Sequence, residues 1–215
     1  MASLPAAWRA ELSRAIDEAA EHLSLYQLTI EQDTPFFALR AAGKLIPPDD
    51  DAARALYDVT QDVTAARGLP AYEISNHARP GAACRHNLVY WRYHEYAGVG
   101  PGAHGRLLVD GARRATSTEK RPEAWLTRVE TDGHGLVSDE ALLRSEQADE
   151  FLLMGLRLAE GIDPQRYAAF AGHALEESRI ATLGHEGLIE TVDGRLRVTR
   201  AGFPLLDAVV ADLAA

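Results

Sequence analysis

The sequence predicts an α/β fold built in two parts, and three observations lead to this class. Between residues 5 and 100, segments with a helical pattern alternate with short apolar segments typical of strands. After about Ala115 the pattern changes to helices, a short hairpin and a last helix. A composition of 47% hydrophobic and 25% charged residues is that of a folded globular protein. We therefore expect part of an α/β sheet or barrel followed by a small α+β domain.

In the first part we expect a helix, a strand, a second helix and two short strands, at residues 5–21, 22–31, 49–67, 71–75 and 96–100. The first helix follows from the spacing of Trp8, Leu12 and Ile16, which places them on one face. The first strand is mostly apolar, as in strands buried within a parallel sheet. The second helix starts with three aspartates, which its dipole favours, and Gly68 follows its end. Strand, helix and strand at this spacing predict a right-handed parallel crossover.

In the second part we expect two helices, a hairpin and a final helix, at residues 145–161, 174–189, 188–199 and 203–213. The first of these helices is amphipathic, with Phe151, Leu152 and Leu158 on one stripe. The hairpin follows from Asp193-Gly194, a strong turn signal between two β-rich arms. This order of elements resembles a winged-helix module. The domains we expect are a sheet or barrel part, a connecting segment and a winged-helix-like domain, at residues 1–115, 116–140 and 141–215.

Composition and charge restrict the class of protein. The net charge is −10, from 32 acidic and 22 basic residues. This disfavours a broad nucleic-acid surface, because phosphate binding needs a positive field. No apolar run approaches the roughly 20 residues that span a bilayer, the N-terminus lacks the layout of a secretory signal, and one cysteine cannot form an intrachain disulfide. We therefore expect a cytoplasmic protein that meets membranes only through its partners.

The charge is locally reversed between His77 and Arg106. Four arginines stand in this stretch against the single acid Glu95, namely Arg79, Arg85, Arg92 and Arg106. Such an excess favours a small anionic ligand over a polymer. Alternatively, these arginines pair with acids elsewhere in the fold, and charge alone does not separate the two interpretations.

The stretch CRHNLVYWRYHEYAGVGPGAHG, residues 84–105, concentrates side chains of the types that bind ligands. Structural zinc sites take four nitrogen or sulfur ligands, which one cysteine and scattered histidines fit poorly. We therefore expect Cys84 to be a small, partly buried residue. The glycines lack the spacing of a dinucleotide or phosphate loop. They either let a ligand approach the backbone at the end of a strand or form a tight corner.

The motif HNLVYW is expected to form a turn of helix, with His86 and Tyr90 on one face and Asn87 and Trp91 on the adjoining face. A neutral imidazole or a phenolate can ligate iron. The neighbouring rings can cover a flat macrocycle, and an arginine such as Arg85 can pair with its carboxylates. Alternatively, His86 and Asn87 bond a loop while Tyr90 and Trp91 fill the core. The residues alone leave both interpretations open.

Five segments resemble the C-terminal part of the HemW-type radical S-adenosylmethionine (SAM) haem chaperones, a family similar to oxygen-independent coproporphyrinogen III oxidases. They are HLSLYQLTIE, AYEISNHARPGAACRHNLVYW, YAGVGPGAHG, LLMGLRLAEGID and GLIETVDGRLRVTRAG. The resemblance runs from about Pro5 to the C-terminus. It implies an α/β fold class, namely the C-terminal part of a radical-SAM partial TIM-like barrel followed by a small winged-helix-like α+β domain.

The resemblance also implies a haem site at the HNxxYW motif, with His86 as the iron ligand and arginines facing the haem propionates. A barrel strand, or the residues just after it, would hold Tyr26, Gln27 and Glu31. The barrel mouth near SAM or substrate would be lined by Gly98, Gly100, Gly102 and His104. The cofactor-binding residues implied in this way are Gln27, Arg85, His86, Asn87, Tyr90, Trp91, Gly98, Gly100, Gly102 and His104. No catalytic residue is implied.

The sequence departs from the family pattern in one decisive respect. The family holds its [4Fe-4S] cluster with three cysteines in a CxxxCxxC-type motif, which is absent here. Iron–sulfur clusters need thiolate ligands, which Cys84 alone cannot supply. The family pattern also has an aromatic residue where His77 stands and a serine where Gly105 stands. We therefore expect a fragment that keeps weak haem affinity without radical chemistry, whose longer parent holds the cluster and SAM.

Three functional hypotheses follow. The first is part of a haem chaperone that delivers haem to respiratory haem proteins. The second is part of an oxygen-independent coproporphyrinogen III oxidase, although the HNxxYW motif favours the chaperone. The third is a winged-helix DNA-binding module, supported by Arg195, Arg197 and Arg200 but opposed by the net charge. A partial barrel would also expose the edge of its first strand, so we expect self-association.

Overall fold

The computed structural model describes residues 3–214 and has a mixed α/β fold, as the sequence predicts. It divides into two compact units, Met1–Cys84 and Arg85–Ala215. The domain boundaries predicted from the sequence, at residues 115 and 140, stay a prediction.

The first unit contains three helices and two short strands among its described residues: α1 (Leu4–Glu18), β1 (His22–Ser24), α2 (Pro35–Ala41), α3 (Asp50–Ala66) and β2 (Asn76–Ala78). Both long helices were predicted from the sequence. Asp49 caps α3, because its carboxylate accepts a hydrogen bond of 2.8 Å from the Ala52 amide. Asp50 and Asp51 then stand in the first turn, where the helix dipole favours negative charge.

The predicted parallel crossover in this unit is wrong. Strands β1 and β2 are antiparallel, with Leu23 opposite His77. The predicted strand at 71–75 is also wrong, because this segment turns back on β2: the Tyr72 amide donates to the Asn76 carbonyl. The Glu73 carboxylate accepts a hydrogen bond of 3.2 Å from the Ser75 amide. This side-chain bond takes the place of a bond between strands and therefore favours a turn. The predicted strand at 22–31 shortens to His22–Ser24, and the Leu25 amide continues the pairing with one hydrogen bond of 2.8 Å to the Ser75 carbonyl.

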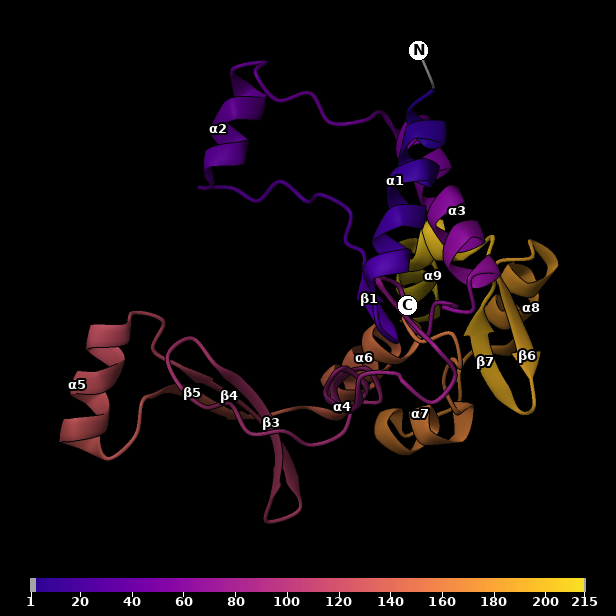
Figure 1. Ribbon diagram of the computed structural model, residues 1–215. Coiled ribbons are helices and arrows are strands. Elements are labelled where there is room, and N and C mark those ends of the chain that lie inside the picture. Colours follow the sequence, from indigo (N-terminus) through magenta and orange to yellow (C-terminus); the bar gives the residue numbers. More distant parts are fainter. Residues whose placement is uncertain (1–2, 215) are drawn as a thin grey trace. The chain divides into compact units, whose positions relative to one another are not determined.

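The core of the first unit lies between α1 and α3, which run side by side in Figure 1. Its buried members are Leu12, Ile16, Val63 and Leu69, and Trp8 packs against them. The chain between β1 and α3 forms a long excursion that carries α2 away from these two helices. Large apolar side chains of this excursion are exposed: Tyr26, Leu28, Phe36, Phe37, Leu39 and Ile46. Such a surface is compatible with the predicted self-association, which stays a prediction.

The buried imidazole of His77 is expected to make the stability of the first unit sensitive to acid. Its side chain is 1% exposed, and neither ring nitrogen has a hydrogen-bond partner among the described residues. Burial, and secondarily the charge of His22, lowers the pKa of His77 from 6.5 to about 4. Between pH 6.5 and about 4, His77 is therefore protonated in the unfolded chain and neutral in the folded chain, which favours unfolding.

We expect the unit to lose on the order of 2 kcal/mol of stability as the pH falls from 6.5 to about 4. His77→Phe should abolish this loss, because phenylalanine does not titrate. Hydrogen exchange of the α1 and α3 amides, measured against pH, checks the prediction, with His22→Phe as the control for the weaker charge effect. An equal acid dependence in wild type and His77→Phe would contradict it.

The second unit contains α4 (Arg85–Trp91), β3 (His104–Val109), β4 (Ala112–Thr118), α5 (Pro122–Asp132), β5 (Leu136–Ala141), α6 (Arg144–Gly155), α7 (Pro164–Ala171), α8 (Glu177–His185), β6 (Ile189–Val192), β7 (Arg195–Val198), the 3₁₀ turn η1 (Phe203–Leu205) and α9 (Leu206–Ala214). Strands β3, β4 and β5 form an antiparallel sheet. Figure 1 shows α5 at the far end of this sheet, away from helices α6 to α9.

One prediction for this region is wrong. Residues 96–100 do not form a strand; only Tyr96 pairs, in an isolated antiparallel bridge with Arg106. The segment 116–140, whose role as a connection stays a prediction, holds the end of β4, helix α5 and most of β5. Pro122 starts α5 and Gly133 ends it in the left-handed conformation, a pair of signals that marks a helix in sequence.

The winged-helix-like part follows the predicted order with one addition. The hairpin of β6 and β7 turns at Asp193 and Gly194, both with positive φ, as a two-residue turn requires. The amphipathic helix α6 ends at Gly155, earlier than predicted, and α7 follows as a separate helix. The core includes Leu152, Leu196 and Val209, each at most 1% exposed. No helix within residues 3–214 has the length and apolar character of a membrane span.

Candidate functional site

Helix α4 carries the HNxxYW motif and brings two of its rings together. His86 and Tyr90 are one helical turn apart and therefore share a face. The Tyr90 hydroxyl lies 3.1 Å from Nε2 of His86. The two ring centroids are 4.8 Å apart in an edge-to-face arrangement. The predicted pairing on one helix face is therefore confirmed.

Tyr96 adds a third ring, which the motif by itself does not contain. Its backbone exchanges two hydrogen bonds of 2.8 Å with Arg106. This bridge holds the Tyr96 ring against Tyr90, with centroids 4.4 Å apart. Burial raises the pKa of the Tyr96 phenol, so this group stays neutral near pH 7. We call His86, Tyr90 and Tyr96 the α4 ring cluster.

The imidazole of His86 is exposed, whereas the two tyrosines of the cluster are half-buried. The imidazole is thus accessible to a ligand, and both interpretations that the residues left open stay predictions. Among residues 3–214, no three histidine, cysteine, aspartate or glutamate side chains are grouped so as to hold a metal ion. A metal at His86 would therefore have to bring its other ligands with it, as haem iron does.

The other motif residues lie on the adjoining side of α4. Trp91 is half-buried, and the Arg157 guanidinium lies 5.9 Å from its ring centroid. Asn87 is also half-buried and has partners of its own. Arg85 is exposed at the start of the helix. These positions fit a role for Trp91 in packing and leave Arg85 available to solvent.

The glycine-rich segment after α4 is a chain reversal. A Cβ at Gly98 would overlap the backbone of His104, so the two chain segments approach each other more closely than any other residue allows. Gly100 and Gly102 have φ of +94° and +68°, in the left-handed region. His104 is exposed at the start of β3, opposite Ser117. The tight corner is therefore real, and cofactor contact by these residues stays a prediction.

Gln27 lies in the first unit, on an exposed segment without regular structure between β1 and α2. Its predicted contact with a cofactor stays a prediction. Cys84 is half-buried at the end of the same unit and is a free thiol.

Two of the arginines noted in the sequence pair with acids. Arg92 binds Glu160 through two hydrogen bonds of 2.8 and 2.9 Å, and Arg106 binds Glu150. The pairing interpretation thus holds for these two residues. Burial tends to raise the pKa of Glu150, but its bonds with Arg106 and Tyr93 hold the value below the ordinary range.

A second set of arginines was not predicted from the sequence. Arg113 and Arg166 both donate to the carbonyl oxygen of Tyr93, at 3.2 and 3.0 Å. Nη1 of Arg113 is buried without a hydrogen-bond partner among the described residues. Burial first, and the charge of Arg113 second, lowers the pKa of Arg166. No signal in the sequence marks this cluster, because its members stand on β4 and α7, far apart along the chain.

Two cavities among the described residues of the second unit bear on ligand binding. One of about 40 Å³ is lined in part by Trp91, Arg92 and Arg166. The other, about 470 Å³, lies among α6, α7, α8 and α9 and contains none of the site residues predicted from the sequence. Only the second has the size of an ordinary ligand pocket, roughly 300–1,000 Å³. The α4 ring cluster lines neither cavity, so a ligand bound there lies on the surface.

Comparison with known proteins adds family information. Residues 142–205 match the HemN C-terminal domain family. The chain is 34% identical to "Radical S-adenosyl methionine domain-containing protein 1, mitochondrial" of Danio rerio, covering 94% of this chain and 48% of the relative. It is 30% identical to the haem chaperone HemW of Bacillus subtilis (89% and 50%) and 34% identical to that of Escherichia coli (75% and 41%). The chain thus spans about half the length of these relatives.

A solved structure is also similar. Coproporphyrinogen III oxidase (HemN) from Escherichia coli, described as a radical SAM enzyme, matches with a TM-score of 0.71 at 17% identity. The match covers 99% of this chain and 52% of that chain. At this identity the likeness concerns the fold alone. It agrees with the fold class predicted from the sequence.

Proposed function

Because this chain belongs to the HemW-type family of radical-SAM proteins, we propose that its α4 surface binds haem as the cargo of a haem chaperone. The relatives of 30–34% identity that carry the name HemW are haem chaperones. One observation carries the proposal for this chain: the His86 imidazole is exposed on α4, within a cluster of three rings.

The donor set of the cluster fits haem iron. A neutral imidazole has one protonated nitrogen and one with a free lone pair. When Nε2 of His86 carries the proton, it donates to the Tyr90 hydroxyl at 3.1 Å and leaves Nδ1 free for iron. Tyr90 would then act as the orienting partner that metal-bound histidines commonly have. The face of Tyr96 would offer apolar contact to the macrocycle, and Arg85 would meet a propionate.

The functions of the whole protein are also proposals. We propose that the parent delivers haem to respiratory haem proteins and holds a [4Fe-4S] cluster and SAM, with Gln27, Gly98, Gly100, Gly102 and His104 near the cluster and SAM, and with Asn87 and Trp91 at the haem. The single cysteine of this chain does not fit the cluster, whose ligands would come from outside residues 1–215. A cytoplasmic location is likewise proposed, although the Danio rerio relative is named mitochondrial.

Titration of the chain with ferric haem tests the proposal. We expect the wild type to give a Soret spectrum typical of histidine ligation, and His86→Ala to lose at least about tenfold in affinity with a changed spectrum. His134→Ala, which removes another exposed histidine of the same unit, is the matched control. Identical Soret spectra and affinities for wild type and His86→Ala would remove His86 from the site.

Tyr90→Phe tests the role of the hydroxyl separately. The ring contacts remain, but the hydrogen bond to His86 is lost. We expect a haem affinity about tenfold lower with the axial histidine retained, because partners that orient a metal-bound histidine typically contribute tenfold or more. The same spectra measure both quantities, and an unchanged affinity would exclude an orienting role for Tyr90.

A coproporphyrinogen III oxidase remains the second candidate, because the fold is that of HemN. Incubation of the whole protein with SAM, a reductant and coproporphyrinogen III discriminates the two. We expect no decarboxylated product if the protein is a chaperone. DNA binding is disfavoured, because Arg195 pairs with Glu160 and Arg197 pairs with Glu190 in the hairpin.

A further inference from the structure

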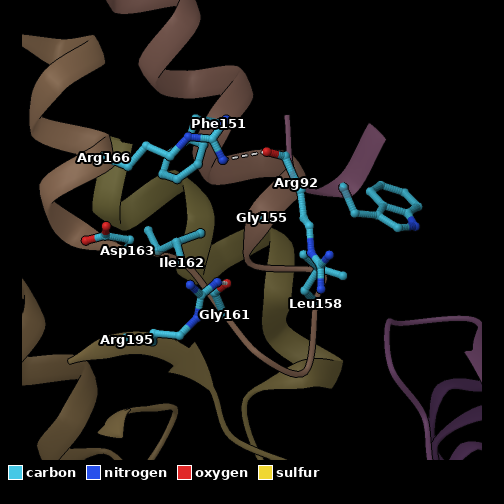
Figure 2. Close-up of a pocket in the computed structure, with 10 residues that line it drawn as sticks. Arg92, Phe151, Gly155, Leu158, Gly161, Ile162, Asp163, Arg166 and Arg195 are labelled. Atoms are coloured by element: carbon cyan, nitrogen blue, oxygen red, sulfur yellow. Dashed lines mark hydrogen bonds between the residues drawn. The ribbon is translucent and has the colours of Figure 1, made fainter. Parts of the chain in front are cut away.

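The small cavity at the end of α4 has a positively charged lining. Three arginines from three different elements surround it, as Figure 2 shows: Arg92 after α4, Arg166 on α7 and Arg195 on β7. The one acid in the lining is Asp163. Glu160 stands outside the lining and is shared between Arg92 and Arg195. Two carboxylates thus face three guanidiniums, and the local charge is positive.

The arginines keep donors free for a ligand. Each guanidinium carries five N–H bonds. Arg166 donates one to the Arg92 carbonyl at 2.6 Å and one to the Tyr93 carbonyl at 3.0 Å. Arg195 uses Nε and Nη2 for the carbonyls of Glu160 and Gly161, and its Nη1 has no acceptor within residues 3–214. Fixed guanidiniums with spare donors are the arrangement that recognises planar or tetrahedral oxyanions.

The size of the cavity limits what it can take. A volume of about 40 Å³ corresponds to about three water-sized groups, at roughly 10–15 Å³ each. One carboxylate or phosphate group fits this space, and a macrocycle does not. The apolar side of the lining includes Phe151, Leu158 and Ile162, so that an entering anion is partly shielded from water and feels the charges strongly.

We propose that this cavity is a binding site for one small oxyanion, a carboxylate or a phosphate group, held by Arg92, Arg166 and Arg195. The site is separate from the α4 ring cluster and does not depend on haem binding. Trp91 lines it, so its indole reports occupancy. Trp8 and Trp125 lie outside the lining and serve as internal references.

The test is a titration of the chain with sodium phosphate and, separately, sodium propionate at constant ionic strength, followed by the three indole N–H signals in NMR. We expect a saturable shift of the Trp91 signal with a Kd in the range of about 1–10 mM or tighter. A response to phosphate alone, or to propionate alone, identifies the source of the oxyanion. No saturable shift with either anion would overturn the proposal.

Variants locate the anion. Arg166→Gln and Arg195→Gln should each weaken binding at least about tenfold, because each removes a fixed charge. Arg197→Gln is the matched control on β7, since this side chain pairs with Glu190 outside the lining. If Arg166→Gln and Arg195→Gln both bind the anion as strongly as the wild type does, the proposal is overturned.

Asp163→Asn is a control for misfolding, because this variant is expected to bind the anion more tightly and not more weakly. Asp163 caps α7 by accepting from the Gln165 amide at 2.8 Å, and asparagine caps equally well. Removing the one negative charge of the lining should tighten binding by roughly fivefold. Weaker binding in the arginine variants without tighter binding in Asp163→Asn would indicate a collapsed lining and would also overturn the proposal.

Discussion

Gly161→Ala is expected to destabilise the second unit by about 3–5 kcal/mol. Gly161 has φ of +66°, in the left-handed region that costs other residues roughly 1–2 kcal/mol. A Cβ there would also overlap the backbone carbonyl of Leu196 and approach Cα of Arg197 to 2.7 Å. Backbone atoms cannot move aside without breaking the paired bonds between Ile162 and Leu196, at 2.8 and 2.9 Å.

Urea unfolding of the whole chain, with hydrogen exchange of the β7 amides, measures this effect. Gly187→Ala is the matched control, because Gly187 has φ of +71° in the same unit but open space around its Cα. The control should lose only the conformational part, roughly 1–2 kcal/mol. Equal losses in the two variants would show that the close approach at Gly161 contributes nothing.

Glu150→Ala is expected to destabilise the same unit by about 3 kcal/mol. Glu150 accepts hydrogen bonds from Arg106 at 2.6 Å and from the Tyr93 hydroxyl at 2.7 Å. Arg113 lies over the Tyr93 ring at 4.1 Å. Removal of the carboxylate would leave a buried hydroxyl and two nearby guanidiniums without their anion. It would also release the contact through which α6 holds β3.

The pH dependence provides an independent check of the same contact. The folded pKa of Glu150 lies below the unfolded value of 4.5, so its contribution to stability is present above that value and is lost as the pH falls through the folded pKa. The difference in unfolding free energy between wild type and Glu150→Gln should therefore be largest at neutral pH and shrink below pH 4.5. Glu130→Ala, an exposed acid on α5, is the control. A difference that does not depend on pH would contradict the assignment.

Local signals in the sequence predicted several elements correctly. Asp49 and the acids after it start α3, and Asp193-Gly194 turns the last hairpin. The same signal at Asp110-Gly111, where both residues have positive φ, joins β3 to β4, although this hairpin was not predicted. The information was therefore present in the sequence. The surrounding strands were harder to detect, because neither face of the sheet is fully buried and the apolar alternation is weak.

By itself the sequence determined the family, the mixed fold and the pairing of His86 with Tyr90, because four residues make one helical turn wherever a helix forms. Only the tertiary structure decided that β1 and β2 are antiparallel, that Tyr96 joins the ring cluster, and that Arg166 and Arg195 meet at one cavity. The physical reason is the range of the contacts. Periodicity fixes neighbours three or four residues apart, whereas contacts at other separations, such as Tyr90 with Tyr96 or Leu23 with His77, are selected by the packing of the whole unit.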